Sequence, residues 1–305
     1  MFREIITVEH KSAIVLAMFG TAVESGLPGL LHVRELMARA WPQTPVRIAF
    51  TSNIIRRIWR QRAQDRQYAQ NHPEVPAAVL KVQGPLAAIA NLLDAEYDSV
   101  VVQPVQIAPA GEFFALAATV EGLNSIRTIK PGVKPVPTLA IGRPALGTFG
   151  AGYPYVADVR AAAESLAADA RLAEEAGAAL LYMGHGSNYF PSGGIYLQFA
   201  AAMRELYPGV LTVIANLEGF PSVDDALVLL RESGTEKVIL KPFLVAAGGH
   251  VRKDMVGPGS WKARLEREGF TVEPILSGLA EQDSFVRIFI DHAADAAADA
   301  GIVLR

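Results

Sequence analysis

Short, continuous apolar segments alternate with longer segments of helical pattern along the whole chain. In the first half these segments are 13–19, 46–50, 99–105 and 136–141. The second half repeats the order at 178–183, 211–215, 238–245 and 272–276. Apolar strands separated by helices are typical of a parallel sheet whose two faces are both covered. The pattern therefore predicts an α/β fold with two similar doubly wound domains, each with a mainly parallel four-stranded sheet flanked by helices.

The two halves also share landmarks, which indicates a duplication. Four correspondences keep the same order: Gly20 with Gly186, Ala49 with Ala215, Pro104 with Pro242, and Gly142 with Gly278. A stretch with glycine and proline at 149–155 separates the halves. We therefore expect an N-terminal α/β domain over 1–149 and a C-terminal α/β domain over 150–305, facing each other across a central cleft. The longest predicted helices are 30–40, 53–70, 192–207, 223–233 and 285–300.

Three potential metal ligands follow strands of the second half. His185, Glu218 and His250 each stand at or just after a strand end. Ligands of open α/β sheets bind outside the carboxyl ends of the strands, and each βα unit returns the chain to that edge after about 30 residues. The spacing therefore predicts one shared site. Since lone histidines often only satisfy hydrogen bonds in the core, the spacing alone leaves that alternative open.

The ligand types narrow the chemistry. The chain has no cysteine, which excludes iron–sulfur clusters and thiolate zinc sites. Two imidazoles and a carboxylate suit a divalent ion such as Co²⁺, Ni²⁺, Fe²⁺ or Zn²⁺. The corresponding first-half positions are Phe19, Ser52 and Glu112, so we expect the second half to bind the metal and the first half to form the opposite wall of the cleft.

Several partner classes are not expected. The net charge of −3 gives no basic footprint for nucleic acid. No apolar run of about 18 residues is present, so no membrane span is predicted, and the first residues lack the pattern of a signal peptide. A cytoplasmic location is expected. The run GHGS at 184–187 lacks the spacing of a phosphate loop, so no nucleotide is predicted.

Other residues are assigned by position. Arg252 and Lys253 are candidates for pairing with ligand carboxylates, and Met18, Phe19, Phe113 and Met183 could form apolar cleft walls or ordinary core. The arginines 56, 57, 60, 62 and 66 are expected on a solvated helix face, with steering of a polyanionic substrate as the alternative. Four histidines have no other candidate site residues around them and are predicted to lie at the surface: His10, His32, His72 and His292.

At these residues the sequence resembles the anaerobic sirohydrochlorin cobaltochelatases, class II tetrapyrrole chelatases related in fold to ferrochelatase. The resemblance runs over nearly the whole chain, and the segments that carry it are LAMFGT (16–21), AFTSNIIRRIWRQR (49–62), VVVQP (100–104), MGHGS (183–187), LEGFPSVD (217–224), LVAAGGHVRKDM (244–255), SWK (260–262) and LSGLAE (276–281). It implies ATP-independent insertion of Co²⁺ into a planar modified tetrapyrrole for corrinoid biosynthesis, and often assembly into homo-oligomers. By the family motifs, His185 and His250 are the paired catalytic histidines and Glu218 is their acidic partner. The predicted substrate contacts are Phe19, Gly20, Thr21, Gln106, Glu112, Phe113, Met183, Arg252 and Lys253.

The sequence departs from the common family pattern beside these residues. Gln106 stands where a histidine is frequent, Gly249 where an aspartate commonly precedes the second catalytic histidine, and Lys253 where an asparagine is usual. Asn188 lies in a run where a further histidine is frequent. The alternatives are therefore Fe²⁺ or Ni²⁺ as the metal, a non-catalytic tetrapyrrole or metal carrier, and a two-lobed solute receptor.

Overall fold

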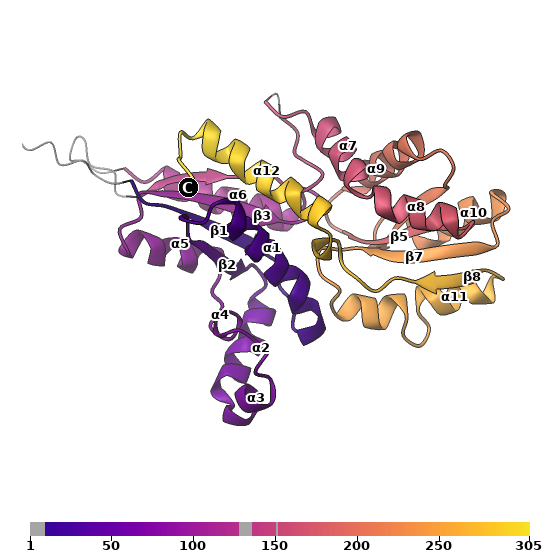
Figure 1. Cartoon of the computed structure of the whole chain (residues 1–305), viewed down its shortest axis with the longest axis horizontal. Coiled ribbons are helices and arrows are strands. Elements are labelled where there is room, and N and C mark those ends of the chain that lie inside the picture. The colour runs from indigo at the N-terminus through magenta and orange to yellow at the C-terminus, as the bar shows by residue number, and fades with distance from the viewer. Residues whose placement is uncertain (1–9, 128–135, 151) are drawn as a thin grey trace, which may run out of the picture.

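Two parallel sheets organise the chain in the computed structural model, which describes residues 10–127, 136–150 and 152–305. The first sheet has the order β2-β1-β3-β4 and the second the order β6-β5-β7-β8 (Figure 1). The strands are β1 Ser12–Met18, β2 Val46–Phe50, β3 Ser99–Val105, β4 Thr138–Ile141, β5 Ala179–Gly186, β6 Thr212–Glu218, β7 Lys237–Phe243 and β8 Thr271–Pro274. All neighbouring strands are parallel. The predicted α/β fold with two four-stranded sheets is confirmed.

Side chains point alternately to the two faces of each strand, and this explains how helices cover both faces of each sheet. In β1, Ile14 and Leu16 belong to one core cluster with α1 (Leu27–Ala40) and α12 (Asp283–Asp299). Val15, between them, belongs to a second cluster with α5 (Pro85–Asp94) and α6 (Gly111–Asn124). Because successive side chains of a strand point to opposite faces, a continuous apolar segment becomes buried on both sides.

The second sheet is covered in the same way. Tyr182 faces the cluster that includes α7 (Tyr155–Ser165), α8 (Ala167–Glu175) and α9 (Gly193–Leu206). Its neighbours Leu181 and Met183 face the cluster of α10 (Val223–Glu232) and α11 (Trp261–Arg267). The cluster around Tyr182 also contains Ile14 of β1, so one hydrophobic core joins the two halves. Short helical turns complete the connections: η1 Glu24–Gly26, the π-helix η2 Val251–Met255 and η3 Leu279–Glu281.

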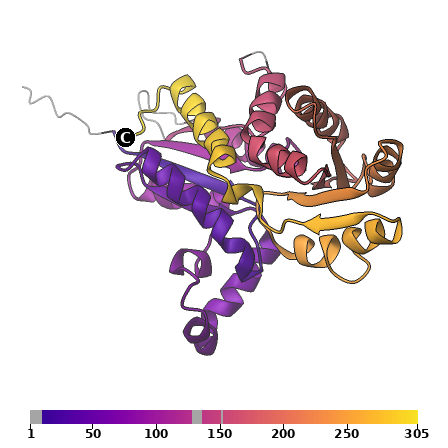
Figure 2. The same cartoon turned by 45° about the vertical axis from the view of Figure 1, so that its right-hand side comes forward.

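The C-terminal helix α12 crosses from one half to the other. Although it follows β8 in the chain, it lies against β3, β4 and α1 of the first half (Figures 1 and 2). The division of the chain into domains at 149/150 stays a prediction. By that division α12 belongs to the C-terminal domain, yet it packs on the sheet of the N-terminal one. Its apolar face, with Phe285 and Phe289 fully buried, belongs to the core cluster that both halves share, and the ring centre of Phe285 lies 6.4 Å from that of Phe243 in β7.

A buried polar network fixes this crossing and corrects one prediction. His292 of α12 is only 3% exposed, whereas a surface position was predicted. Its Nε2 lies 3.1 Å from Oδ1 of Asp158 in α7, and its Nδ1 lies 3.0 Å from the carbonyl oxygen of Arg143. The Arg143 guanidinium donates to Asp158 and to Asp295. A buried histidine needs such partners, and they come from segments far apart in the sequence.

A helical arm extends from the first half below β2 (Figures 1 and 2). It consists of α2 Asn53–Gln64, α3 Arg66–Asn71 and α4 Ala77–Leu80. The single helix predicted over 53–70 is wrong, because Asp65 is extended and its side chain caps α3 by accepting from the Gln67 amide. Short polar side chains compete with the helical backbone in this way.

The arginines of the arm also differ from the prediction of a uniformly solvated face. Arg62 stacks over Trp59, with its guanidinium carbon 4.5 Å from the ring centre, and donates to the carbonyl of Ala22. Arg56 donates to the carbonyls of Phe50 and Thr51 at the end of β2. Arg57, Arg60 and Arg66 are exposed as predicted. No described helix is long and apolar enough to cross a membrane.

Candidate functional site

The end of β5 depends on a glycine, because this position has no room for a Cβ atom. Gly186 has φ +68°, and a Cβ built there would lie 1.9 Å from the carbonyl oxygen of Glu218. Gly186 and Glu218 are register partners at the ends of β5 and β6. The strand ends can therefore approach closely, which brings His185 and Glu218 to the same edge of the second sheet.

His185 and His250 lie in contact. Their ring centres are 5.1 Å apart and the planes are almost perpendicular, at 86°. His250 comes from the loop after β7 and directly precedes the π-helix η2. Two residues about 65 positions apart in the chain thus meet because β5 and β7 are neighbours in a parallel sheet. Both rings are exposed to solvent.

One nitrogen of each ring already has a hydrogen-bond partner. Nδ1 of His185 lies 3.0 Å from the carbonyl oxygen of Gly186, and Nδ1 of His250 lies 2.7 Å from Oδ2 of Asp254. A carbonyl oxygen and a carboxylate only accept, so each Nδ1 donates. In the neutral ring Nε2 then carries the free lone pair, which is the arrangement found in metal-binding histidines. Asp254 was not predicted, although its spacing of four residues after His250 on one helical turn was a usable signal.

The carboxylate of Glu218 lies at this edge but does not complete a preformed ligand set. Among the described residues, no three His, Asp or Glu side chains gather closely enough to hold a metal ion. The predicted set of His185, Glu218 and His250 therefore stays a prediction for the metal-bound protein. The structure shows the two imidazoles together and Glu218 half-buried on the neighbouring strand.

The first half contributes an acidic group opposite the histidines. Glu112 lies in the first turn of α6. Burial raises the pKa of its carboxyl, and electrostatic attraction to His185 partly offsets that rise. Glu112 thus belongs to the charged surroundings of His185, although it comes from the other half of the chain. A carboxyl with a raised pKa keeps its proton to a higher pH than an ordinary glutamate.

Aromatic side chains are exposed beside this group, and they correct part of the prediction. Phe19 is 49% exposed at the end of β1. Phe113 is buried, whereas its neighbour Phe114 is 46% exposed and contacts Phe190 of the second half, with ring centres 5.2 Å apart. Adjacent residues of a helix point in different directions, and α6 has no distinct apolar face, so the exposed member of this pair could not be chosen from the sequence.

Two further predicted substrate contacts are structural in this fold. Met183 is fully buried against α10 and α11, because it lies two residues before the strand end that carries His185. Thr21 is 5% exposed, and its hydroxyl bonds both the N–H and the carbonyl of Val23. A Cβ on Gly248 would lie 3.3 Å from Thr21 Oγ1, so Thr21 packs against the loop that leads to His250.

The remaining predicted contacts stand near the strand ends or on η2. Gly20 follows β1 with φ +93°, and a Cβ there would lie 2.7 Å from the Phe50 ring. Gln106 follows β3, and its side-chain amide is buried with no hydrogen-bond partner in the described part of the chain. Arg252 and Lys253 of η2 are exposed, as is Asn188. These positions stay predicted substrate contacts.

With its two four-stranded parallel sheets, the chain has the fold of solved chelatases. The chain is similar in fold to SirB from Bacillus subtilis, solved with Fe³⁺, at a TM-score of 0.59 with 12% identity, covering 97% of this chain and 100% of that one. A second SirB structure, from Bacillus subtilis subspecies spizizenii in complex with cobalt, gives a TM-score of 0.55 with 11% identity over 95% of this chain and 96% of that one.

Comparison of sequences identifies the family. The family model described as cobalt chelatase (CbiK) matches residues 12–298, so the chain belongs to the CbiK cobalt chelatase family and is a metal chelatase. It is 32% identical to the sirohydrochlorin cobaltochelatase CbiKC of Nitratidesulfovibrio vulgaris, over 92% of this chain and 89% of that protein. It is 25% identical to a sirohydrochlorin cobaltochelatase of Salmonella typhimurium, over 92% of this chain and 95% of that protein.

Proposed function

We propose that this protein inserts Co²⁺ into sirohydrochlorin without nucleotide hydrolysis, and that His185 and His250 carry the reaction. The observation that carries the proposal is the contact between the two rings, each held through Nδ1 with Nε2 free. Membership of the cobalt chelatase family and the named activity of two relatives support the choice of metal and tetrapyrrole.

Metal insertion makes two demands on the residues of the site. The ion must exchange water and protein ligands for four pyrrole nitrogens, and the macrocycle must lose two N–H protons. Two neutral imidazoles offer Nε2 lone pairs that bind a divalent ion without closing its coordination sphere, so the ion can still leave. In this proposal Glu218, at the end of the neighbouring strand, approaches as a third ligand or balances the charge of the ion.

Residues of the first half are proposed to contact the opposite face of the macrocycle. Glu112 of α6 feels the charge of His185, and the raised pKa of its carboxyl suits it to accept a pyrrole proton that the ion displaces. Exposed rings of Phe19 and Phe114 offer flat apolar surface to a planar ligand. Arg252 and Lys253, exposed on η2 beside His250, supply positive charge for substrate carboxylates.

Replacement of either histidine tests the proposal. We expect His185→Ala and His250→Ala each to lower the turnover of Co²⁺ insertion by at least 100-fold while the thermal transition stays unchanged, because both rings are exposed. The measurement is the visible spectrum of sirohydrochlorin during multiple turnovers with Co²⁺. His10→Ala is the matched control, since His10 precedes the start of β1, at the end of the sheet remote from the strand ends of the site.

The same assay separates the alternatives. An enzyme converts many substrate molecules per chain, whereas a carrier changes the spectrum of at most one. Wild-type turnover in either histidine variant, or a change limited to one equivalent, would refute the proposal. Parallel assays with Fe²⁺ and Ni²⁺ rank the metals. A cytoplasmic location and assembly into homo-oligomers stay predictions.

A further inference from the structure

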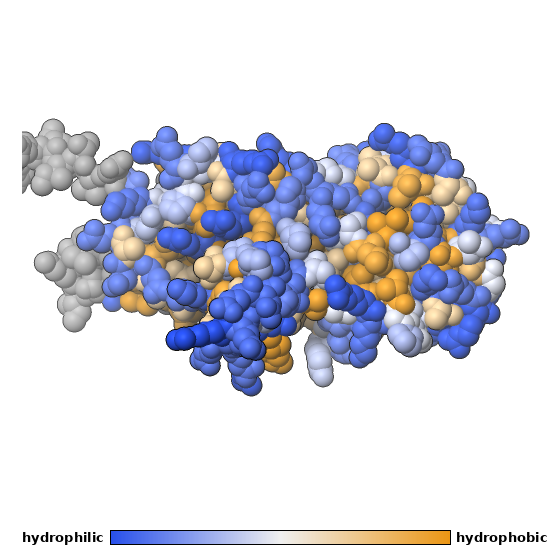
Figure 3. Space-filling view, turned by 60° about the horizontal axis from the view of Figure 1, so that its bottom comes forward, coloured by the Kyte–Doolittle hydropathy of each residue, from blue (hydrophilic) through white to orange (hydrophobic). Residues whose placement is uncertain are grey.

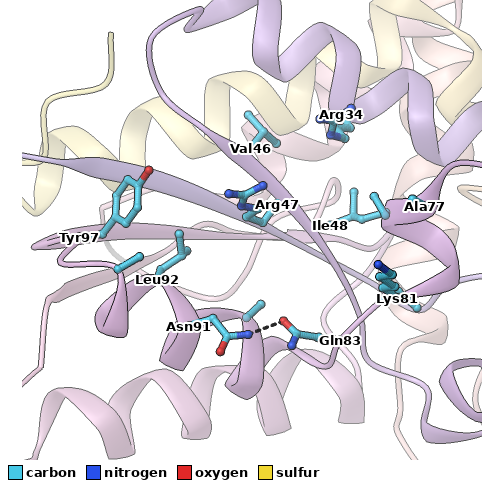
Figure 4. A pocket seen from close by; sticks show the side chains of 14 residues that line it. Arg34, Val46, Arg47, Ile48, Ala77, Lys81, Gln83, Asn91, Leu92 and Tyr97 are labelled. Carbon is cyan, nitrogen blue, oxygen red and sulfur yellow. Dashed lines mark hydrogen bonds between the residues drawn. The ribbon is translucent and has the colours of Figure 1, made fainter. Parts of the chain in front are cut away.

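A pocket of about 450 Å³ lies beside the outer strand of the first sheet, and none of its lining residues belongs to the site described above. Strand β2 forms its back, and α1, α4, α5 and the segment before β3 surround it (Figure 4). Its volume is within the range of small-molecule sites in proteins.

All charged side chains that line this pocket are positive. Arg34, Arg47 and Lys81 line it, and no carboxylate does. The side chains of these three cations are exposed and form no hydrogen bond or ion pair with another described residue. Exposed cations elsewhere, such as Arg57 and Arg60, share this property, so what sets these three apart is that they line one pocket without a carboxylate. Three unpaired cations around one concavity repel each other, and a bound anion removes that repulsion.

The remaining lining is suited to an organic body. The pocket floor contains the buried side chains of Val46, Val82, Ala88 and Leu92. In Figure 4 the Tyr97 ring and Lys81 stand at opposite ends, with Arg47 between them. An apolar or aromatic body fits the end with Tyr97 and Leu92, while acid groups reach Arg47 and Lys81.

An amide pair adds directional hydrogen bonding. Nδ2 of Asn91 donates to Oε1 of Gln83 at 2.8 Å (Figure 4). This bond orients both amides and leaves Nε2 of Gln83 and Oδ1 of Asn91 for a further partner. The Gln83 backbone is held as well, because its carbonyl accepts from the Phe50 amide at the end of β2. Both amides are exposed, and the bond between their side chains gives them a defined mutual orientation.

We propose that this pocket is a second ligand site, which binds a small organic polyanion: a molecule with two or more negative charges on a flat or apolar body. Phosphorylated and polycarboxylate ligands share this chemistry. The site is separate from the proposed metal site, so its occupancy does not require metal insertion.

Isothermal titration calorimetry of the full chain, without added metal, tests the proposal. ADP and benzene-1,3,5-tricarboxylate are the phosphate and carboxylate probes, and adenosine and pyrophosphate supply the body and the charge alone. We expect saturable binding of ADP, of the tricarboxylate or of both, at least tenfold tighter than either partial probe and weaker at higher salt. The stronger of the two probes identifies the acid group.

Charge removal in the pocket provides the decisive comparison. Because each charge-assisted hydrogen bond contributes about a factor of ten in affinity, Arg47→Gln with Lys81→Gln is expected to weaken binding by at least tenfold. The matched control is Arg57→Gln with Arg60→Gln, which removes the same charge from the exposed face of α2. An unchanged thermal transition shows that each variant folds.

Two results would overturn the proposal. One is the absence of saturable binding of both full probes at millimolar concentration. The other is an equal loss of affinity in the pocket and control variants, which would mean unspecific attraction to a basic surface. Failure here leaves Co²⁺ insertion untouched, since His185 and His250 are tested by the spectrum of the tetrapyrrole.

Discussion

At the scale of single residues, the orientation of two rings decides the chemistry. His250 is held through Nδ1 by Asp254 and His185 through Nδ1 by the Gly186 carbonyl, and the two ring centres are 5.1 Å apart. The strand-end positions of both histidines are predictable, because they follow apolar runs. Asp254 stands four residues after His250, and only the structure shows that a helical turn at η2 makes this spacing a contact.

The contact between Asp254 and His250 leads to a prediction at the scale of single residues. Asp254→Ala removes the acceptor that orients His250, and partners of this kind typically change activity by about 10- to 100-fold. We expect kcat for Co²⁺ insertion to fall in that range with little change in KM, and Asp254→Asn to retain more activity because its amide oxygen still accepts from Nδ1. Asp291→Ala, which breaks an exposed pair with Arg287 at the same spacing, is the control. Full kcat in Asp254→Ala would show that the contact is incidental.

At the scale of elements, strand ends and helix breaks depend on local backbone geometry. The strands follow from continuous apolar runs, which is why their positions agree with the prediction to within a few residues. The break at Asp65 and the extension of β5 to Gly186 do not follow from those runs. They depend on a side-chain cap and on a left-handed glycine, whose effect is confined to one residue.

Gly186 allows a matched test of this point. Gly186→Ala adds a Cβ that meets the Glu218 carbonyl at 1.9 Å, in addition to the cost of a left-handed alanine. Gly177→Ala has a similar φ of +59° with nothing within 4 Å of the added Cβ. We expect the control to lose about 1 kcal/mol of unfolding free energy and Gly186→Ala to lose about 2–4 kcal/mol.

Urea unfolding of both variants measures the difference. Equal losses would mean that β5 and β6 separate without cost at this end. In that case the close approach of Gly186 and Glu218 would not be needed for the fold.

At the scale of the whole molecule, α12 and one continuous core join the two sheets. The space-filling view shows hydrophilic side chains over the projecting arm, while hydrophobic ones gather on the half that holds the second sheet (Figure 3). The network of Arg143, Asp158 and His292 lies where α12 crosses between halves. Burial acts to raise the pKa of Asp158, but hydrogen bonds and charge from His292 and Arg143 outweigh it, so the pKa is lowered.

This network predicts a pH dependence of stability. An aspartate with a lowered pKa stabilises the fold above its ordinary value of 3.8, and this contribution is lost as pH falls below that value. Asp158→Asn removes the charged partner of His292 and one of the two carboxylate partners of Arg143, which keeps Asp295, so we expect a loss of about 2–3 kcal/mol at pH 7. The gap from wild type should narrow as pH falls below about 4.

Unfolding free energies of wild type and Asp158→Asn across this pH range measure the effect, with the exposed Asp291→Asn as the control. A gap that is constant from pH 7 down to pH 3 would show that the charge of Asp158 contributes nothing. In that case the network would act through packing alone.

The sequence by itself determined the two parallel sheets, their strands and the positions of His185, Glu218 and His250, because apolar runs and strand ends are local patterns. Only the tertiary structure decided that His292 is buried, that Phe114 rather than Phe113 is exposed, and that α12 covers the first sheet. It also decided which cations stay unpaired around β2. Burial and pairing depend on what the rest of the chain brings to a residue, and segments distant in sequence supply those partners only after folding.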